Sequence, residues 1–256
     1  MQTTTDRRPS AVRRRTAALA AAAALAAAVT AAAAVPAAAA EAPPVPSYDF
    51  SDCPDLPAGA DATRWKCEVL TATGSMTLGS RHVPALAPMT LTHAEGPMPD
   101  GSKGQVWGAL RSEPTPVPGG LLGNPAGHGL PPLLSLSLQP EYGGRSDFYS
   151  VGNSLGLFTV RYRAIGPLLP QGCVIGGDAP LEIRLQRVGD SRWVSKNPPV
   201  IAFDAKDELF TAPAAEGCGP LGRLVNDRLG LPAAQGNAMT LSATYTFKTY
   251  DQLPPH

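Results

Sequence analysis

Charged and aromatic side chains are scarce in this sequence of 256 residues. Lys, Arg, Asp and Glu make up 16% of it and apolar residues 43%, a balance that argues against a disordered chain. Beyond residue 40 the sequence lacks the clustered positive charge that nucleic-acid phosphates require. Aromatic residues, at 6%, are too few to predict a stacking platform for sugars.

The motifs of common cofactor and catalytic sites are missing as well. No dinucleotide fingerprint follows a predicted strand, and no two cysteines stand two to four residues apart, as zinc ligands commonly do. His82, His93 and His128 are scattered and form no H-x-x-x-H pair, which gives a zinc hydrolase little support. The sequence therefore predicts no cofactor, no metal site and no set of catalytic residues, and it favours a non-enzymatic protein.

Glycine and proline, in contrast, are abundant, with 26 and 28 residues, and all but two of these follow residue 40. Both residues disfavour helix interiors, so their number argues against a helical bundle. Short runs of alternating apolar and polar residues lie between them, and this period of two predicts β-strands. The predicted strands span residues 65–72, 75–78, 89–92, 105–110, 134–138, 157–164, 181–188 and 239–247.

These strands predict a mostly β protein with one short helix. Thr73-Gly74 falls between two of the runs, which is typical of a hairpin turn. In residues 239–247 the apolar side chains share one face, as in antiparallel sheets that are covered on one side. An antiparallel β-sandwich is the simplest closure for such strands. A helix is predicted at about residues 219–229, because apolar residues there recur at helical spacing and Gly230 follows as a C-cap.

Residues 1–40 are typical of a signal peptide. Arginines end at Arg15, a long Ala/Leu/Val stretch follows, and Ala38-Ala39-Ala40 supplies the small residues of a cleavage site. Cleavage after about Ala40 would release a secreted protein with a formal charge of −4 and no stable membrane span. The mature chain would begin with a Pro-rich linker at 41–50, followed by a β-sandwich domain at 51–256.

Two questions about export stay open. Residues 17–40 are uncharged and long enough to span a bilayer as an uncleaved anchor, but Ala favours membrane insertion far less than Leu, so we expect cleavage. Consecutive arginines suit the twin-arginine route. The residues after Arg15 lack the large apolar pair of that signal, so the sequence does not choose between the Sec and Tat routes.

The four cysteines, Cys53, Cys67, Cys173 and Cys218, predict two disulfides in an exported chain. Four cysteines allow three pairings, and the sequence alone does not select one. We favour Cys53–Cys67 and Cys173–Cys218, because each of these pairs lies within one half of the chain.

The segment from Ser112 to Pro132 is rich in proline and glycine and longer than most loops in compact domains. It is open to three interpretations: an ordered crossover, a linker that splits the chain near 118–130, or a binding loop. As a binding loop it would present Leu121, Leu122 and His128 as candidate binding residues.

Gly152-Asn153-Ser154-Leu155-Gly156 matches the G-x-S-x-G motif of a nucleophilic serine. That motif needs a turn between a buried parallel strand and a helix, whereas residues 157–164 are themselves predicted as a strand. A glycine-rich hairpin turn therefore fits these residues better than an esterase site.

Turn and cysteine motifs in the second half of the chain follow a distinctive order. Gly166-Pro167-Leu168-Leu169 and Cys173-Val174-Ile175-Gly176 precede Gly217-Cys218-Gly219 and Gly230-Leu231-Pro232. Over residues 160–250 this order resembles a set of secreted actinobacterial proteins that are usually left uncharacterised. The resemblance implies a scaffold without a named reaction, and it supports the pairing of the two cysteines in that region, Cys173 and Cys218.

Three functional hypotheses follow. The first is a secreted, non-catalytic protein that binds an apolar ligand or a cell-envelope partner. The second is a secreted hydrolase that uses Ser154. The third is a structural component of the extracellular matrix or envelope.

Overall fold

The computed structural model describes residues 46–124, 131–149 and 151–254. The predicted signal peptide, the first half of the Pro-rich linker and His128 lie outside these ranges. The described residues belong to one compact unit.

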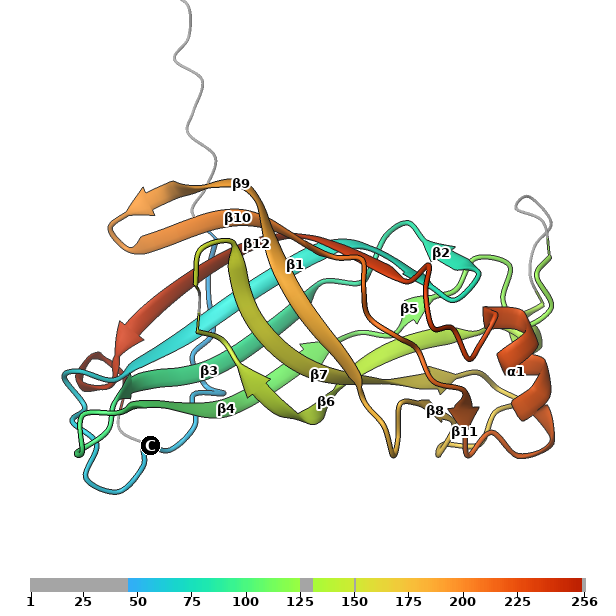
Figure 1. Cartoon of the computed structure of the whole chain (residues 1–256), viewed down its shortest axis with the longest axis horizontal. Helices are drawn as coiled ribbons and strands as arrows, with labels where there is room; N and C mark the ends of the chain where they lie inside the picture. The colour runs from blue at the N-terminus through green and yellow to red at the C-terminus, as the bar shows by residue number, and fades with distance from the viewer. Residues whose placement is uncertain (1–45, 125–130, 150, 255–256) are drawn as a thin grey trace, which may run out of the picture. The chain divides into compact units, whose positions relative to one another are not determined.

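Most of the described residues lie in β-strands, and one α-helix, α1 (Gly222–Leu229), lies at one end of the sheet (Figure 1). The strands are β1 Lys66–Leu78, β2 Arg81–Val83, β3 Met89–Pro97, β4 Lys103–Ser112, β5 Thr115–Pro116, β6 Ser137–Asp147, β7 Ser154–Ile165, β8 Val174–Ile175, β9 Leu181–Lys196, β10 Pro199–Asp207, β11 Ala215–Glu216 and β12 Ala238–Thr249. The predicted mostly β fold with one short helix is thus confirmed.

The strands of the described residues form one antiparallel sheet, in which β11-β8-β7-β9-β10-β12-β1-β3-β4 follow one another and β6 pairs with the other side of β7. The sheet curls until β4 lies beside β6 (Figure 1). The predicted strands therefore bury their apolar faces within one curled sheet, where a sandwich would use two facing sheets. Strand twist and the register shifts in four of the ladders supply the curvature.

The two edges of the curled sheet meet in two different ways. At the end near α1, β5 continues the direction of β4 and pairs with β6 through Thr115 and Leu138. Further along, β4 and β6 are joined by side chains: the ring of Trp107 stacks on that of Tyr142 at 3.7 Å, and Gln139 Nε2 donates to the Ser112 carbonyl at 2.7 Å. This length of the seam is held without a backbone ladder.

In β1 the structure differs from the turn that the sequence pattern predicted. A hairpin turn at Thr73-Gly74 was expected, but β1 runs without a break through these residues and pairs with β12 along its length. Gly74 is needed there because a side chain would collide with the Thr240 carbonyl of β12. The glycine thus marks a close approach between two strands, and the turn prediction is wrong.

The end of the sheet near α1 is closed by a continuous apolar core. Val225 and Leu229 of α1 are fully buried against it, and the helix ends at Gly230, which adopts a left-handed conformation with φ 71°. The turn after β1 holds this helix end, since Ser80 donates its N–H to the Leu229 carbonyl at 2.8 Å. The predicted helix at about 219–229 corresponds to α1 and the 3-10 turn at Gly219–Leu221 that precedes it.

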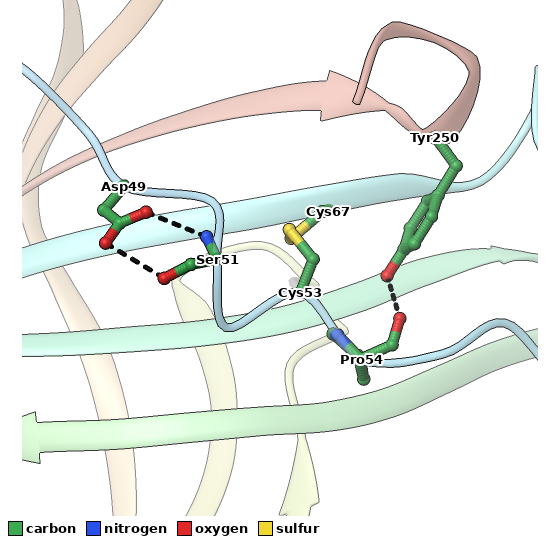
Figure 2. The surroundings of a disulfide bond; sticks show 6 residues. All are labelled: Asp49, Ser51, Cys53, Pro54, Cys67 and Tyr250. Atoms are coloured by element: carbon green, nitrogen blue, oxygen red, sulfur yellow. Dashed lines mark hydrogen bonds between the residues drawn. A yellow bond between two sulfur atoms is a disulfide. The ribbon is translucent and has the colours of Figure 1, made fainter. Parts of the chain in front are cut away.

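Both predicted disulfides, Cys53–Cys67 and Cys173–Cys218, are present. The second fixes the segment before α1 to the strands beside it. The first anchors the N-terminal segment over β1, and Figure 2 shows a second tie beside it, in which the Tyr250 hydroxyl donates to the Pro54 carbonyl at 2.6 Å. Two disulfides indicate an oxidising compartment.

The Pro/Gly-rich segment after β4 is an ordered crossover over its described length. Val117 and Leu121 donate backbone N–H groups to the carbonyls of Leu136 and Leu134. The guanidinium of Arg228, a buried residue of α1, donates to the Gly120 carbonyl at 2.6 Å and also to that of Pro118. One cation of the helix thus fixes a loop that lies about a hundred residues earlier in the chain.

Removing the Cys173–Cys218 bond by replacing both residues with Ser should lower the free energy of unfolding by about 4 kcal/mol, because the bond closes a long loop in the unfolded chain. The shorter loop of Cys53–Cys67 predicts about 3 kcal/mol for its own double replacement. Urea unfolding of the two variants measures both values. Equal stability of the wild type and both variants would contradict the prediction.

Replacing Arg228 with Met should cost about 2 kcal/mol, because Met keeps most of the side-chain volume but leaves two carbonyls without their charged donor. Arg223→Met is the matched control, since Arg223 lies on the exposed side of the same helix and should change stability by less than about 0.5 kcal/mol. Urea unfolding compares the two. Similar losses in both variants would refute the role assigned to Arg228.

Candidate functional site

The inside of the curled sheet contains an apolar cavity of about 80 Å³. Its walls come from strands on all sides of the sheet, so that no single element defines it. They include Leu70, Leu91, Phe158, Leu185, Phe203 and Leu241. Because the end near α1 is filled by the core, the cavity can open only toward the other end of the sheet.

A wider space of about 350 Å³ with charged walls adjoins this cavity; we call it the mouth. The mouth and the cavity share five lining residues: Leu70, His93, Phe148, Leu155 and Phe203. The other residues of the mouth are mostly polar: Glu68, Glu95, Lys103, Tyr149, Arg187, Ser191 and Tyr245. An apolar interior therefore meets a charged entrance.

The mouth is charged because the lining residues of several strands change character at the same end. In β1, Ala72 and Leu70 line the cavity and Glu68 lines the mouth. In β9, Leu185 lines the cavity and Arg187 lines the mouth. Neighbouring strands pair side by side, so these polar positions collect at one end of the sheet.

Glu68 and His93 form the innermost polar pair of the mouth. They are directly opposite each other on β1 and β3, and His93 Nε2 lies 3.9 Å from Glu68 Oε2. Burial and the neighbouring charge of Glu95 raise the pKa of Glu68 to about 7. Burial lowers the pKa of His93 to about 4, so this imidazole is neutral at physiological pH.

Two buried nitrogen atoms in the mouth lack a hydrogen-bond partner within the described part of the chain. They are Nδ1 of His93, a residue that is only 6% exposed, and Nε of Arg187. His93 also packs against the ring of Phe148, with 4.6 Å between ring centroids. The nearby ammonium of Lys103 lies over the ring of Tyr149 at 5.1 Å. The mouth therefore holds polar groups whose bonding is incomplete.

The candidate binding loop is divided by the structure. Leu121 is 2% exposed and belongs to the core, so it is not displayed to a partner. Leu122 is 54% exposed beside it, and His128 lies outside the described residues. Leu121 thus serves packing, and Leu122 alone is an exposed apolar residue of this described stretch.

Ser154 lies at the start of β7, in the hairpin turn that was expected for its motif. Its hydroxyl accepts a hydrogen bond from the Gly156 N–H at 3.4 Å, and no histidine or carboxylate of the described chain bonds to it. His82 instead bonds to Thr77 on the β1–β2 hairpin. Of the histidines in the described ranges, His93 is the one that lies beside a carboxylate. Within those ranges, no group of His, Cys, Asp or Glu could hold a metal ion.

No sequence pattern identified Glu68, Glu95 or Arg187 as site residues. Cys67 and Val69, on the opposite face of β1 from Glu68, are buried. The N-terminal segment covers that side through the Cys53–Cys67 bond, so β1 is packed on both faces. A usable signal existed nonetheless: Glu68 has the same strand parity as Leu70 and Ala72, which line the cavity.

Comparisons with protein-family models, with curated proteins and with solved structures gave no significant match to this chain. Among the described residues, no helix has the length and apolar character needed to cross a membrane. The functional argument therefore depends on the geometry of the cavity and its mouth.

Glu68 and His93 should affect the pH dependence of stability in opposite directions. The raised pKa of Glu68 means that the folded form keeps a proton that the unfolded form loses, so stability falls as pH rises from about 4.5 to 7. The lowered pKa of His93 means that stability rises between pH 4 and 6.5. The two effects oppose each other in the wild type over the shared range.

Replacing either Glu68 or His93 should expose the contribution of the other residue to the pH dependence of stability. Relative to wild type, Glu68→Gln should gain stability with rising pH, and His93→Gln should lose it, by up to about 1.4 kcal/mol per pH unit in each case. Urea unfolding at pH 5, 6 and 7 measures these slopes. If both variants keep the slope of the wild type, the shifted pKa values of the pair are wrong.

Proposed function

We propose that this chain is a secreted, non-catalytic binding protein that holds a small apolar molecule, or the apolar chain of a cell-envelope component, inside its curled sheet. The observation that carries the proposal is the apolar cavity that adjoins an open, polar mouth. Ligand sites in proteins commonly combine apolar walls with a few polar groups that fix orientation. Secretion is supported by the signal-peptide pattern of residues 1–40 and by the two disulfides.

The dimensions favour a slender ligand. An apolar cavity of about 150 Å³ holds benzene, and the interior here is smaller, at about 80 Å³. A straight alkyl chain is narrower than an aromatic ring and can extend from the mouth into the cavity past Leu155 and Phe203, which line both spaces. Each buried methylene contributes about 0.8 kcal/mol, so a few of them suffice for measurable binding.

The hydrolase hypothesis has weaker support, because no described histidine or carboxylate bonds to Ser154. The structural-component hypothesis has no observation of its own. An assay on ester, peptide and glycoside substrates with Ser154→Ala as the control tests the first, and sedimentation tests the self-association that the second requires. Activity that disappears in Ser154→Ala would favour the hydrolase.

Calorimetric titration with 1-octanol tests the binding proposal, because this alcohol has a slender apolar chain and no charge. We expect saturable binding with a negative heat-capacity change, the mark of buried apolar surface. Ala72→Phe fills part of the cavity and should weaken binding at least about tenfold, since it excludes two or more methylenes.

Two further variants make the test decisive. Leu155→Phe narrows the junction of cavity and mouth and should also weaken binding, which keeps the test valid if Ala72→Phe fails to fold. Leu209→Phe adds the same ring at a residue that is 90% exposed and should leave binding unchanged. Octanol binding that neither cavity variant affects, or that requires Leu122 and is lost in Leu122→Ser, would contradict the cavity as the site.

A further inference from the structure

The unpartnered nitrogen atoms of the mouth indicate what the head of the ligand must be. Arg187 Nε is buried without a partner, and a guanidinium can only donate hydrogen bonds, so the missing group is an acceptor. No ion pair joins Arg187 to a carboxylate of the described residues. His93 Nδ1 is the second unpartnered atom, and its ring is almost fully buried at the junction of mouth and cavity.

The charges around these atoms favour an anionic head. Lys103 adds a second cation to the wall of the mouth, and it too has no ion pair among the described carboxylates. Arginine binds carboxylates in a bidentate manner, with two parallel hydrogen bonds. An ammonium head would offer no acceptor to Arg187, and its positive charge would be repelled by Lys103. An ammonium ligand therefore explains neither the unpartnered Arg187 nor the second cation.

We infer that the mouth binds the carboxylate of a straight-chain carboxylic acid whose alkyl chain lies in the apolar cavity. This inference rests on the proposed function and specifies its ligand class. Arg187 pairs with the carboxylate, Lys103 adds a second positive charge to the mouth, and the neutral ring of His93 donates from Nδ1 where chain and head meet. Leu70, Leu155 and Phe203 line the path from head to chain.

Glu68 and Glu95 are the two acidic groups of this wall, and Glu68 is the inner one. With a pKa near 7, Glu68 is protonated in weakly acidic solution and can then share its proton with a bound carboxylate. The groups around it are Lys66 on its own strand, Glu95 and His93 on β3, Tyr245 on β12, Arg187 on β9 and Lys103 on β4. Above pH 7 Glu68 becomes an anion and repels the ligand.

Octanoate, 1-octanol and octylamine carry heads of different charge on chains of the same length, and calorimetric titration of the complete mature protein with each tests the inference. We expect octanoate to bind at least about tenfold more tightly than 1-octanol, which corresponds to one charge-assisted pair, and octylamine to bind most weakly. Arg187→Gln should remove the preference for octanoate and leave the affinity for 1-octanol within about twofold.

The controls separate charge at the mouth from charge in general. Arg184→Gln changes an arginine of the same strand whose side chain is 64% exposed and pairs with Glu182, and it should leave octanoate binding unchanged. Between pH 6 and pH 8 the wild type should lose affinity for octanoate and not for 1-octanol, and Glu68→Gln should abolish this loss.

The outcomes of these titrations distinguish failure of the carboxylate assignment from failure of the proposed function. Octylamine binding as tightly as octanoate, or equal effects of Arg184→Gln and Arg187→Gln, would overturn the carboxylate assignment while octanol binding still supports the cavity as the site. Absence of binding for all three compounds would overturn the proposed function itself.

Discussion

The fold depends on one constraint: a sheet with one continuous apolar face must bury that face, and the described chain offers a single short helix to cover it. The sheet solves this by curling until its own strands face one another. Near α1 the enclosed side chains pack into a core, and β5 completes the pairing with β6. Toward the mouth the side chains no longer fill the interior, and the cavity is what remains.

Several stabilising contacts lie at the end of the sheet away from the mouth. The Cys173–Cys218 bond, α1 and the Arg228 guanidinium are all tied to the filled end. Two of the buried polar groups with incomplete bonding, His93 and Arg187, are at the mouth. A buried polar atom without a partner costs stability. The filled end offsets such a cost, which allows the mouth to keep polar groups that a ligand can satisfy.

The sequence predicted those features that depend on local pattern or on one residue type. Period-two runs revealed most strands, and the helix was found from Leu and Val spacing before Gly230. The curl of the sheet could not be predicted from the sequence. The contact between Trp107 and Tyr142 depends on strand twist that accumulates over many strands. The mouth was not predicted for a related reason, since Glu68, His93 and Arg187 are far apart in the sequence. In addition, both faces of β1 are covered, so its sequence does not show which face lines the interior of the sheet.

The seam between β4 and β6 has a mechanical consequence. Wherever a backbone ladder joins two strands, their spacing is set by hydrogen-bond length. Between Trp107 and Tyr142 it is set by the thickness of two stacked rings, and the rings can slide over each other without breaking a ladder. The spacing of β4 and β6 at this pair is therefore not fixed by backbone hydrogen bonds, while the facing edges shield each other from pairing with foreign strands.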